Sequence, residues 1–154
     1  MGITAFPLHL LLRHWLHVLP VTWLLAGCAT NPVTGESDYV LMSEQQEIAL
    51  GQRYNQEILK EMPPYDDAKL NTMIQSIGEQ LAAHSHRTGL DYRFTIVDSP
   101  TVNAFALPGG YIYITRGMLA YLNSEAELAA VLGHEIGHVT ARHSVRQHSA
   151  QTTA

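Results

Sequence analysis

Two histidines and a glutamate form the pattern in this sequence with the clearest chemical meaning. His134, Glu135 and His138 have the spacing His-Glu-x-x-His, inside a stretch that we expect to be helical. Residues four apart lie on one face of a helix, so both imidazoles can bind the same metal ion. Glu135 stands next to that face, where a carboxylate can accept a proton from water at the metal. The spacing therefore predicts a hydrolytic site with one Zn²⁺ per subunit, His134 and His138 as metal ligands and Glu135 as the catalytic base.

The residues around this pentapeptide predict the helix that carries it. Ser124 followed by Glu127 is a capping box, which begins a helix just before the motif. Apolar residues then recur at helical spacing, so that one side can pack on a core: Leu128, Val131, Leu132, Ile136 and Val139. Gly133 and Gly137 are weak helix formers, and their place beside the ligands suggests close approach by another element. The alternative is an amphipathic core helix that carries two histidines by chance.

Composition limits the class of protein. The hydrophobic fraction is 46% and the charged fraction 15%, which is typical of a globular chain. Nine Lys and Arg are outnumbered by 14 Asp and Glu, and the basic residues are scattered along the sequence. A nucleic-acid-binding protein usually shows a basic stripe, so we expect no nucleic acid partner.

Residues 1–27 differ from the rest of the chain. They contain no acidic residue, and their apolar part from Trp15 to Leu25 is interrupted by His17 and Pro20. This stretch is too short for a membrane-spanning helix and suits the hydrophobic region of an export signal. It ends in Leu25-Ala26-Gly27-Cys28, which resembles the lipobox of bacterial lipoprotein signal peptides.

The lipobox resemblance implies cleavage before Cys28 and lipidation of this residue, the only cysteine in the sequence. Ala29 in place of Asp after the cysteine resembles the signal for an outer-membrane lipoprotein that faces the periplasm. Residues 28–42 are then a tether between lipid and domain. The alternatives are an ordinary signal peptide with a coincidental cysteine, or a poor anchor helix.

Helices, then strands, then helices are expected from residue 43 onward. A capping box of Ser43 and Gln46 opens a helix to about Lys60, and Asp66 or Asp67 caps the next one. His84 and His86, at the end of that second helix, are expected to face the helix dipole rather than a metal. Strands are predicted over 92–97, 103–107 and 111–115, with a tight turn at 108–110 and a brief helix over 118–122. This order predicts an α+β fold.

Three motifs, in this order, resemble the gluzincin metallopeptidases of the CAAX prenyl protease and HtpX type, especially their exported bacterial lipoprotein branch. They are residues 103–110 with the strand that follows, the helix start Glu125-Ala126-Glu127-Leu128-Ala129, and residues 134–139. The resemblance runs from about Ser43 to the end of the sequence. It implies a zincin-like core, with residues 43–146 as the N-terminal part of the catalytic domain and 147–154 as a disordered tail.

The resemblance also implies roles for single residues. His134 and His138 become zinc ligands and Glu135 the general base. A strand and turn beside the cleft would accept an extended peptide as a further strand, and they comprise Asn103, Ala104, Phe105, Ala106, Gly109 and Gly110. The plainer interpretation of Gly109 and Gly110 is a hairpin turn, which is compatible with that role.

The third zinc ligand of this family is a glutamate on a later helix. No Asp or Glu follows Glu135 in this sequence, so the sequence is expected to be truncated. If the motif helix continued, His143 would lie about 140° from His138 and point away from the metal. We therefore expect His143 to support the site or the fold rather than to bind the metal.

The predicted function is that of a zinc-dependent metalloendopeptidase, anchored by lipid and facing the periplasm. Its substrates would be polypeptides, namely misfolded or membrane-associated proteins of the cell envelope. One alternative is a non-catalytic lipoprotein scaffold or chaperone, or an inactive fragment without the third ligand. Another is a different zinc hydrolase, such as an amidase acting on cell-wall peptides.

Overall fold

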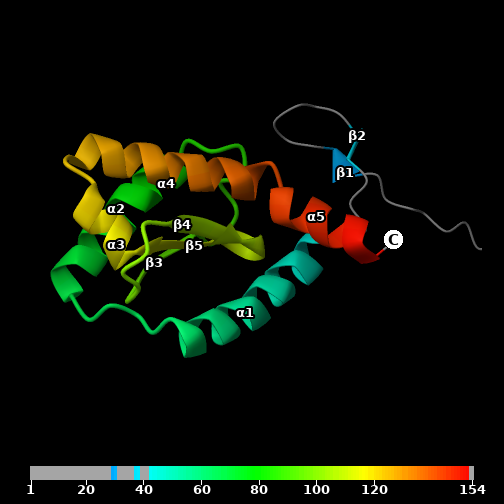
Figure 1. Ribbon diagram of the computed structural model, residues 1–154. Helices are drawn as coiled ribbons and strands as arrows, with labels where there is room; N and C mark the ends of the chain where they lie inside the picture. Colours follow the sequence, from blue (N-terminus) through cyan, green and yellow to red (C-terminus); the bar gives the residue numbers. More distant parts are fainter. Residues whose placement is uncertain (1–28, 31–36, 39–41, 153–154) are drawn as a thin grey trace, which may run out of the picture.

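The computed structural model describes residues 29–30, 37–38 and 42–152 (Figure 1). The predicted signal peptide and Cys28 lie outside these residues. Two short strands, β1 (Ala29–Thr30) and β2 (Ser37–Asp38), form an antiparallel pair within the predicted tether. Among the described residues, no helix has both the length and the apolar character needed to cross a bilayer.

The first two helices begin where their capping residues predict. In α1 (Glu44–Glu61) the Ser43 hydroxyl accepts from the Gln46 N–H, and the Gln46 side chain accepts from the Ser43 N–H at 2.8 Å, which completes the capping box. In α2 (Ala68–Ala82) the Asp67 carboxylate accepts from the Leu70 N–H at 3.0 Å. Asp67, rather than Asp66, is therefore the cap.

A small mixed sheet forms the centre of the molecule. Its strands are β3 (Arg93–Val97), β4 (Ala104–Leu107) and β5 (Tyr111–Thr115). They lie in the order β3-β5-β4, with β5 parallel to β3 and antiparallel to β4. The turn η2 (Pro108–Gly110) joins β4 to β5 through positive φ angles of 77° at Gly109 and 92° at Gly110. Glycine adopts such angles without a steric penalty, so the predicted turn needs both residues.

Helices cover both faces of this sheet, which confirms the predicted α+β class (Figure 1). Ile112 and Ile114 of β5 belong to the larger core, with buried residues of α2 and of the later helix α4 (Glu125–Thr140). Tyr111 and Tyr113 face the other way, toward Ile58 and Leu59 of α1. Side chains alternate between the two faces of β5, so this strand contributes to both hydrophobic cores. All five of its residues are buried.

Two helices flank α4 in the sequence. The brief helix α3 (Arg116–Tyr121) precedes it and starts two residues earlier than predicted. Thr115 is its N-cap, because the Thr115 hydroxyl accepts a hydrogen bond from the Met118 N–H. The helix α5 (His143–Thr152) follows it, where the sequence had led us to expect a disordered tail from residue 147. Val145 and Ser149 are 1% and 5% exposed, so the packing of one face orders a segment that is otherwise polar.

One buried charge cluster was not predicted. Glu47, Arg87 and Arg142, here called the Glu47 cluster, join α1 to the loop after α2 and to the end of α4. Glu47 is 1% exposed; Arg87 Nη1 lies 2.8 Å from its Oε1 and Arg142 Nε lies 2.9 Å from its Oε2. The Gly109 N–H also donates to Glu47. The cluster therefore fixes α1, the η2 turn and the C-terminal end of α4 to one another.

Candidate active site

The helix α4 presents the two histidines of the His-Glu-x-x-His pattern on its open side. The Ser124 hydroxyl accepts from the Glu127 N–H at 3.2 Å, while the Glu127 carboxylate accepts from the Asn123 N–H at 2.7 Å. The predicted apolar face is confirmed, because four of its residues are buried against the sheet and α2, namely Leu128, Leu132, Ile136 and Val139. His134 is consequently exposed and His138 is half-buried.

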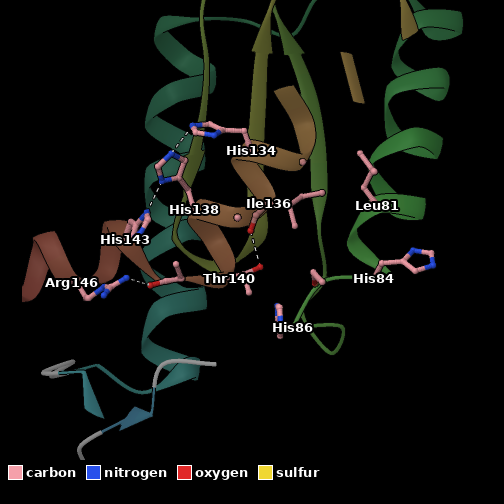
Figure 2. Close-up of a pocket in the computed structure, with 13 residues that line it drawn as sticks. Leu81, His84, His86, His134, Ile136, His138, Thr140, His143 and Arg146 are labelled. Atoms are coloured by element: carbon pink, nitrogen blue, oxygen red, sulfur yellow. Dashed lines mark hydrogen bonds between the residues drawn. The ribbon is translucent and has the colours of Figure 1, made fainter. Parts of the chain in front are cut away.

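The two histidine rings face each other through the nitrogens that would bind a metal. His134 Nε2 and His138 Nε2 lie 3.0 Å apart, and the rings are inclined at 85° (Figure 2). Two nitrogens bound to a tetrahedral zinc ion at ordinary Zn–N distances are about 3.3 Å apart. The pair therefore fits a zinc ion with only a small opening of the rings.

Glu135 directly follows His134 in α4, three residues before His138, and is 7% exposed. Burial raises the pKa of its carboxyl group, and the neighbouring His138 and His134 partly offset this effect. A carboxylate that has lost part of its hydration binds a proton more readily, as a general base requires. The role of Glu135 as a general base stays a prediction.

A groove of about 740 Å³ runs along the outer side of α4 (Figure 2). His134, His138 and His143 line it from one side, and Leu81 and His86 line it from the end of α2 and the loop beyond. Cβ atoms built at Gly133 and Gly137 would meet nothing within 4 Å. The close neighbour that these glycines suggested is thus missing among the described residues, and the glycines widen the groove.

His84 also borders the groove but does not join the histidine pair. Its Nδ1 lies 2.8 Å from the Gln80 carbonyl oxygen, at the end of its own helix. This bond satisfies a terminal carbonyl, in keeping with the predicted role at the helix end.

His143 occupies a position that the sequence did not predict. The helix α4 ends at Thr140, and Arg142 adopts a positive φ of 54°, so the chain turns before α5 begins. The turn brings His143 Nδ1 to 2.6 Å from His138 Nδ1, where a continuous helix would have carried it away. Within the described part of the chain, no group of three His, Cys, Asp or Glu side chains is arranged to hold a metal ion.

The predicted substrate strand β4 lies at one edge of the sheet, next to α4. The Thr115 N–H donates to the Asn103 carbonyl at 3.0 Å, which fixes the alternation of hydrogen bonds along the β4–β5 pair. Phe105 and Leu107 bond to β5, so the peptide groups of Ala104 and Ala106 point away from β5. The Ala106 carbonyl oxygen accepts from the Ser144 hydroxyl of α5 at 3.4 Å. Gly109 and Gly110 are buried in the turn, away from that edge.

Comparison with known proteins places the chain among metallopeptidases. Residues 68–154 match the profile described as "Peptidase family M48". Over 115 residues, or 75% of the chain, it is 35% identical to the "Beta-barrel assembly-enhancing protease" of Yersinia pestis. It is 32% identical to the Escherichia coli protein of that name, over 76% of the chain. It is also 40% identical to the "Mitochondrial metalloendopeptidase OMA1" of Arabidopsis thaliana, over 54% of the chain and 17% of that protein. The chain spans 24% of the length of each of the two bacterial relatives.

Proposed function

Because this chain belongs to peptidase family M48, we propose that it carries the zinc-binding and general-base residues of a metalloendopeptidase. The observation that carries the proposal is the facing pair of Nε2 atoms, 3.0 Å apart on the open side of α4. His134 and His138 would hold the zinc ion, and Glu135 lies between them in sequence with most of its surface buried.

Glu135 moves the proton in the proposed reaction. A bound zinc ion supplies Lewis acidity, which lowers the pKa of water and polarises a peptide carbonyl. The Glu135 carboxylate takes a proton from the attacking water and then delivers it to the leaving amine. Its partial burial favours holding this proton between the two transfers. The groove along α4 gives a polypeptide access to His134 and His138, and Glu135 follows His134 directly in the sequence.

The substrate is proposed to bind as an extended strand along β4. The outward N–H and C=O groups of Ala104 and the outward N–H of Ala106 offer hydrogen bonds that do not depend on substrate sequence. Asn103 and Phe105 hold this strand in register through their pairing with β5. Such recognition suits an enzyme that acts on many unfolded chains.

We further propose that the protein is anchored by lipid at Cys28 and faces the periplasm, where it cleaves misfolded or membrane-associated envelope proteins. Two observations support this setting. One is the lipobox-like sequence Leu25-Ala26-Gly27-Cys28. The other is the similarity to bacterial proteins whose name refers to β-barrel assembly.

The decisive test of the function is the substitution Glu135→Gln, measured on the protein at the full length that its gene encodes. Cleavage of casein should fall by roughly 100- to 10,000-fold, the usual contribution of a general base. Zinc binding should persist, since both histidines remain. Glu125→Gln removes a charge from an exposed position of the same helix and should cleave at the wild-type rate. Wild-type cleavage by the Glu135 variant would refute the assignment.

The strand proposal has its own test. Ala104→Pro removes the outward N–H without touching a bond to β5, and proline is tolerated at such edge positions. Losing one peptide hydrogen bond to the substrate should raise KM by about fivefold, or about 1 kcal/mol. Ala104→Ser keeps the N–H and should retain the wild-type KM. If the two variants cleave equally well, β4 is not the binding edge.

A non-catalytic scaffold is the second candidate. It is favoured because, among the described residues, no three His, Cys, Asp or Glu side chains are arranged to hold a metal ion. Zinc titration with chelator-sensitive proteolysis would support the enzyme. Weak zinc binding without cleavage by the full-length protein would support the scaffold.

A further inference from the structure

His138 has a neighbour at each of its ring nitrogens. Its Nε2 faces His134 at 3.0 Å, whereas its Nδ1 faces His143 Nδ1 at 2.6 Å. Figure 2 shows the three rings in a row along one side of α4. The second contact is a close hydrogen bond between two imidazoles, so one of the two Nδ1 atoms carries the proton.

The function of His138 decides which atom carries it. A neutral imidazole has one N–H, and a histidine that binds a metal must present a bare nitrogen to it. With Nε2 directed to the metal, the proton of His138 lies on Nδ1 and is donated to His143. His143 then accepts through a bare Nδ1 and carries its own proton on Nε2. Ligand histidines usually donate to a carboxylate, carbonyl or water; here the acceptor is a second imidazole.

The fold holds His143 in this place from two sides. On one side, Arg142 Nε lies 2.9 Å from Glu47 and its Nη2 lies 2.9 Å from the Met42 carbonyl oxygen, which fixes the turn between α4 and α5. On the other side, Val145 is 1% exposed and anchors the first turn of α5. The position of His143 therefore depends on the buried framework rather than on a mobile side chain.

We propose that His143 is a positioning residue that holds His138 in the Nδ1–H tautomer and so keeps its Nε2 bare for the metal. This inference rests on the proposed zinc site, but it concerns a residue outside the His-Glu-x-x-His pattern. His143 orients the ligand and does not touch the metal or the substrate. Removing such a partner typically lowers metal affinity by about 10- to 100-fold.

The primary test measures the tautomer of His138 in the metal-free wild-type chain. Two-dimensional ¹⁵N–¹H correlation spectra of the imidazoles, recorded at mildly alkaline pH, assign the protonated nitrogen of each ring. We expect Nδ1–H for His138 and Nε2–H for His143. A His138 ring protonated at Nε2 overturns the proposal. This measurement requires no substitution, so it is unaffected by any variant that fails to fold.

The second test compares substitutions by zinc titration against a chelator. His143→Leu should bind zinc about 10- to 100-fold more weakly and should leave His138 as a mixture of tautomers. His143→Asn places an acceptor oxygen near the former Nδ1 and should restore most of the affinity. His86→Leu removes another histidine of the same groove and should bind zinc as the wild type does. Wild-type affinity in His143→Leu would contradict the proposal.

These results are separable from the test of the function. If Glu135→Gln cleaves normally, the peptidase proposal fails while the tautomer of His138 remains as measured. If His138 has the other tautomer, the role of His143 fails while the effect of Glu135→Gln stands.

Discussion

Polar side chains gather at two places next to or on α4, and the two places differ in how their hydrogen-bonding groups are satisfied. In the Glu47 cluster, both oxygens of a carboxylate that is 1% exposed meet arginines from other parts of the chain. At the candidate active site, two imidazole nitrogens face each other beside an open groove. The first arrangement is complete within the chain and stabilises the fold. In the second arrangement one proton bridges the two nitrogens of the metal-free chain, and a cation in its place would bind both, as a ligand site requires.

The Glu47 cluster also positions the candidate active site. Arg87 donates to the Val139 carbonyl at 3.2 Å, near the end of α4, and Arg142 fixes the turn that brings His143 to His138. Substitutions in the Glu47 cluster should therefore lower stability most, whereas substitutions of His134 or His138 should weaken metal binding with little loss of stability.

The largest expected effect on stability is that of Glu47→Gln. The variant leaves the nearly buried Arg142 without its carboxylate partner and leaves Arg87 with only the exposed Glu44, which should lower the free energy of unfolding by about 3–5 kcal/mol. Glu44→Gln is the matched control, because Glu44 pairs with the same Arg87 but its side chain is 58% exposed. That control should cost less than about 1 kcal/mol. Urea denaturation measures the free energy of unfolding of both variants. If Glu47→Gln and Glu44→Gln lowered it equally, the buried cluster would stabilise the fold no more than the surface ion pair does.

A smaller effect separates the two contributions of Arg142. Both Arg142→Ala and Arg142→Gly lose the bond to Glu47, but only glycine adopts a φ of 54° freely. The glycine variant should therefore be more stable than the alanine variant by about 1 kcal/mol. The same denaturation experiment measures this difference. An alanine variant as stable as the glycine variant would show that the turn relaxes when the ion pair is removed.

The smallest effect on stability is expected at the open site. His134 is exposed, so His134→Ala should change the free energy of unfolding without zinc by less than about 0.5 kcal/mol. The same substitution should abolish tight zinc binding, because it removes one of the two facing nitrogens. A large loss of stability in metal-free protein would mean that the histidine pair is structural.

Local signals in the sequence predicted most of what positions the site. The caps at Ser43 and Ser124 and the apolar face of α4 depend on residues a few positions apart, and the structure contains them. At Ser124 the predicted capping box is not closed, because the Glu127 carboxylate accepts from the Asn123 N–H instead. Strand β5 was also predicted at its observed limits, because β-branched and aromatic residues follow a glycine turn.

The remaining features depend on contacts between distant residues. Glu47 bonds to Arg87 and Arg142, which are 40 and 95 positions away, and no pattern near Glu47 indicates either partner. The turn at Arg142 contains no glycine or proline that would indicate a turn in the sequence. The position of His143 and the folding of residues 143–152 into α5 therefore could not be predicted. These features arise from burial, which only the folded chain defines.

The most direct test of the central claim is X-ray absorption spectroscopy of the full-length protein loaded with one equivalent of zinc. The claim predicts at least two imidazole nitrogens at about 2.0–2.1 Å from the metal. In His134→Ala and in His138→Ala, one of these nitrogens should be lost. A spectrum without imidazole scattering, or one that neither substitution changes, would contradict the account.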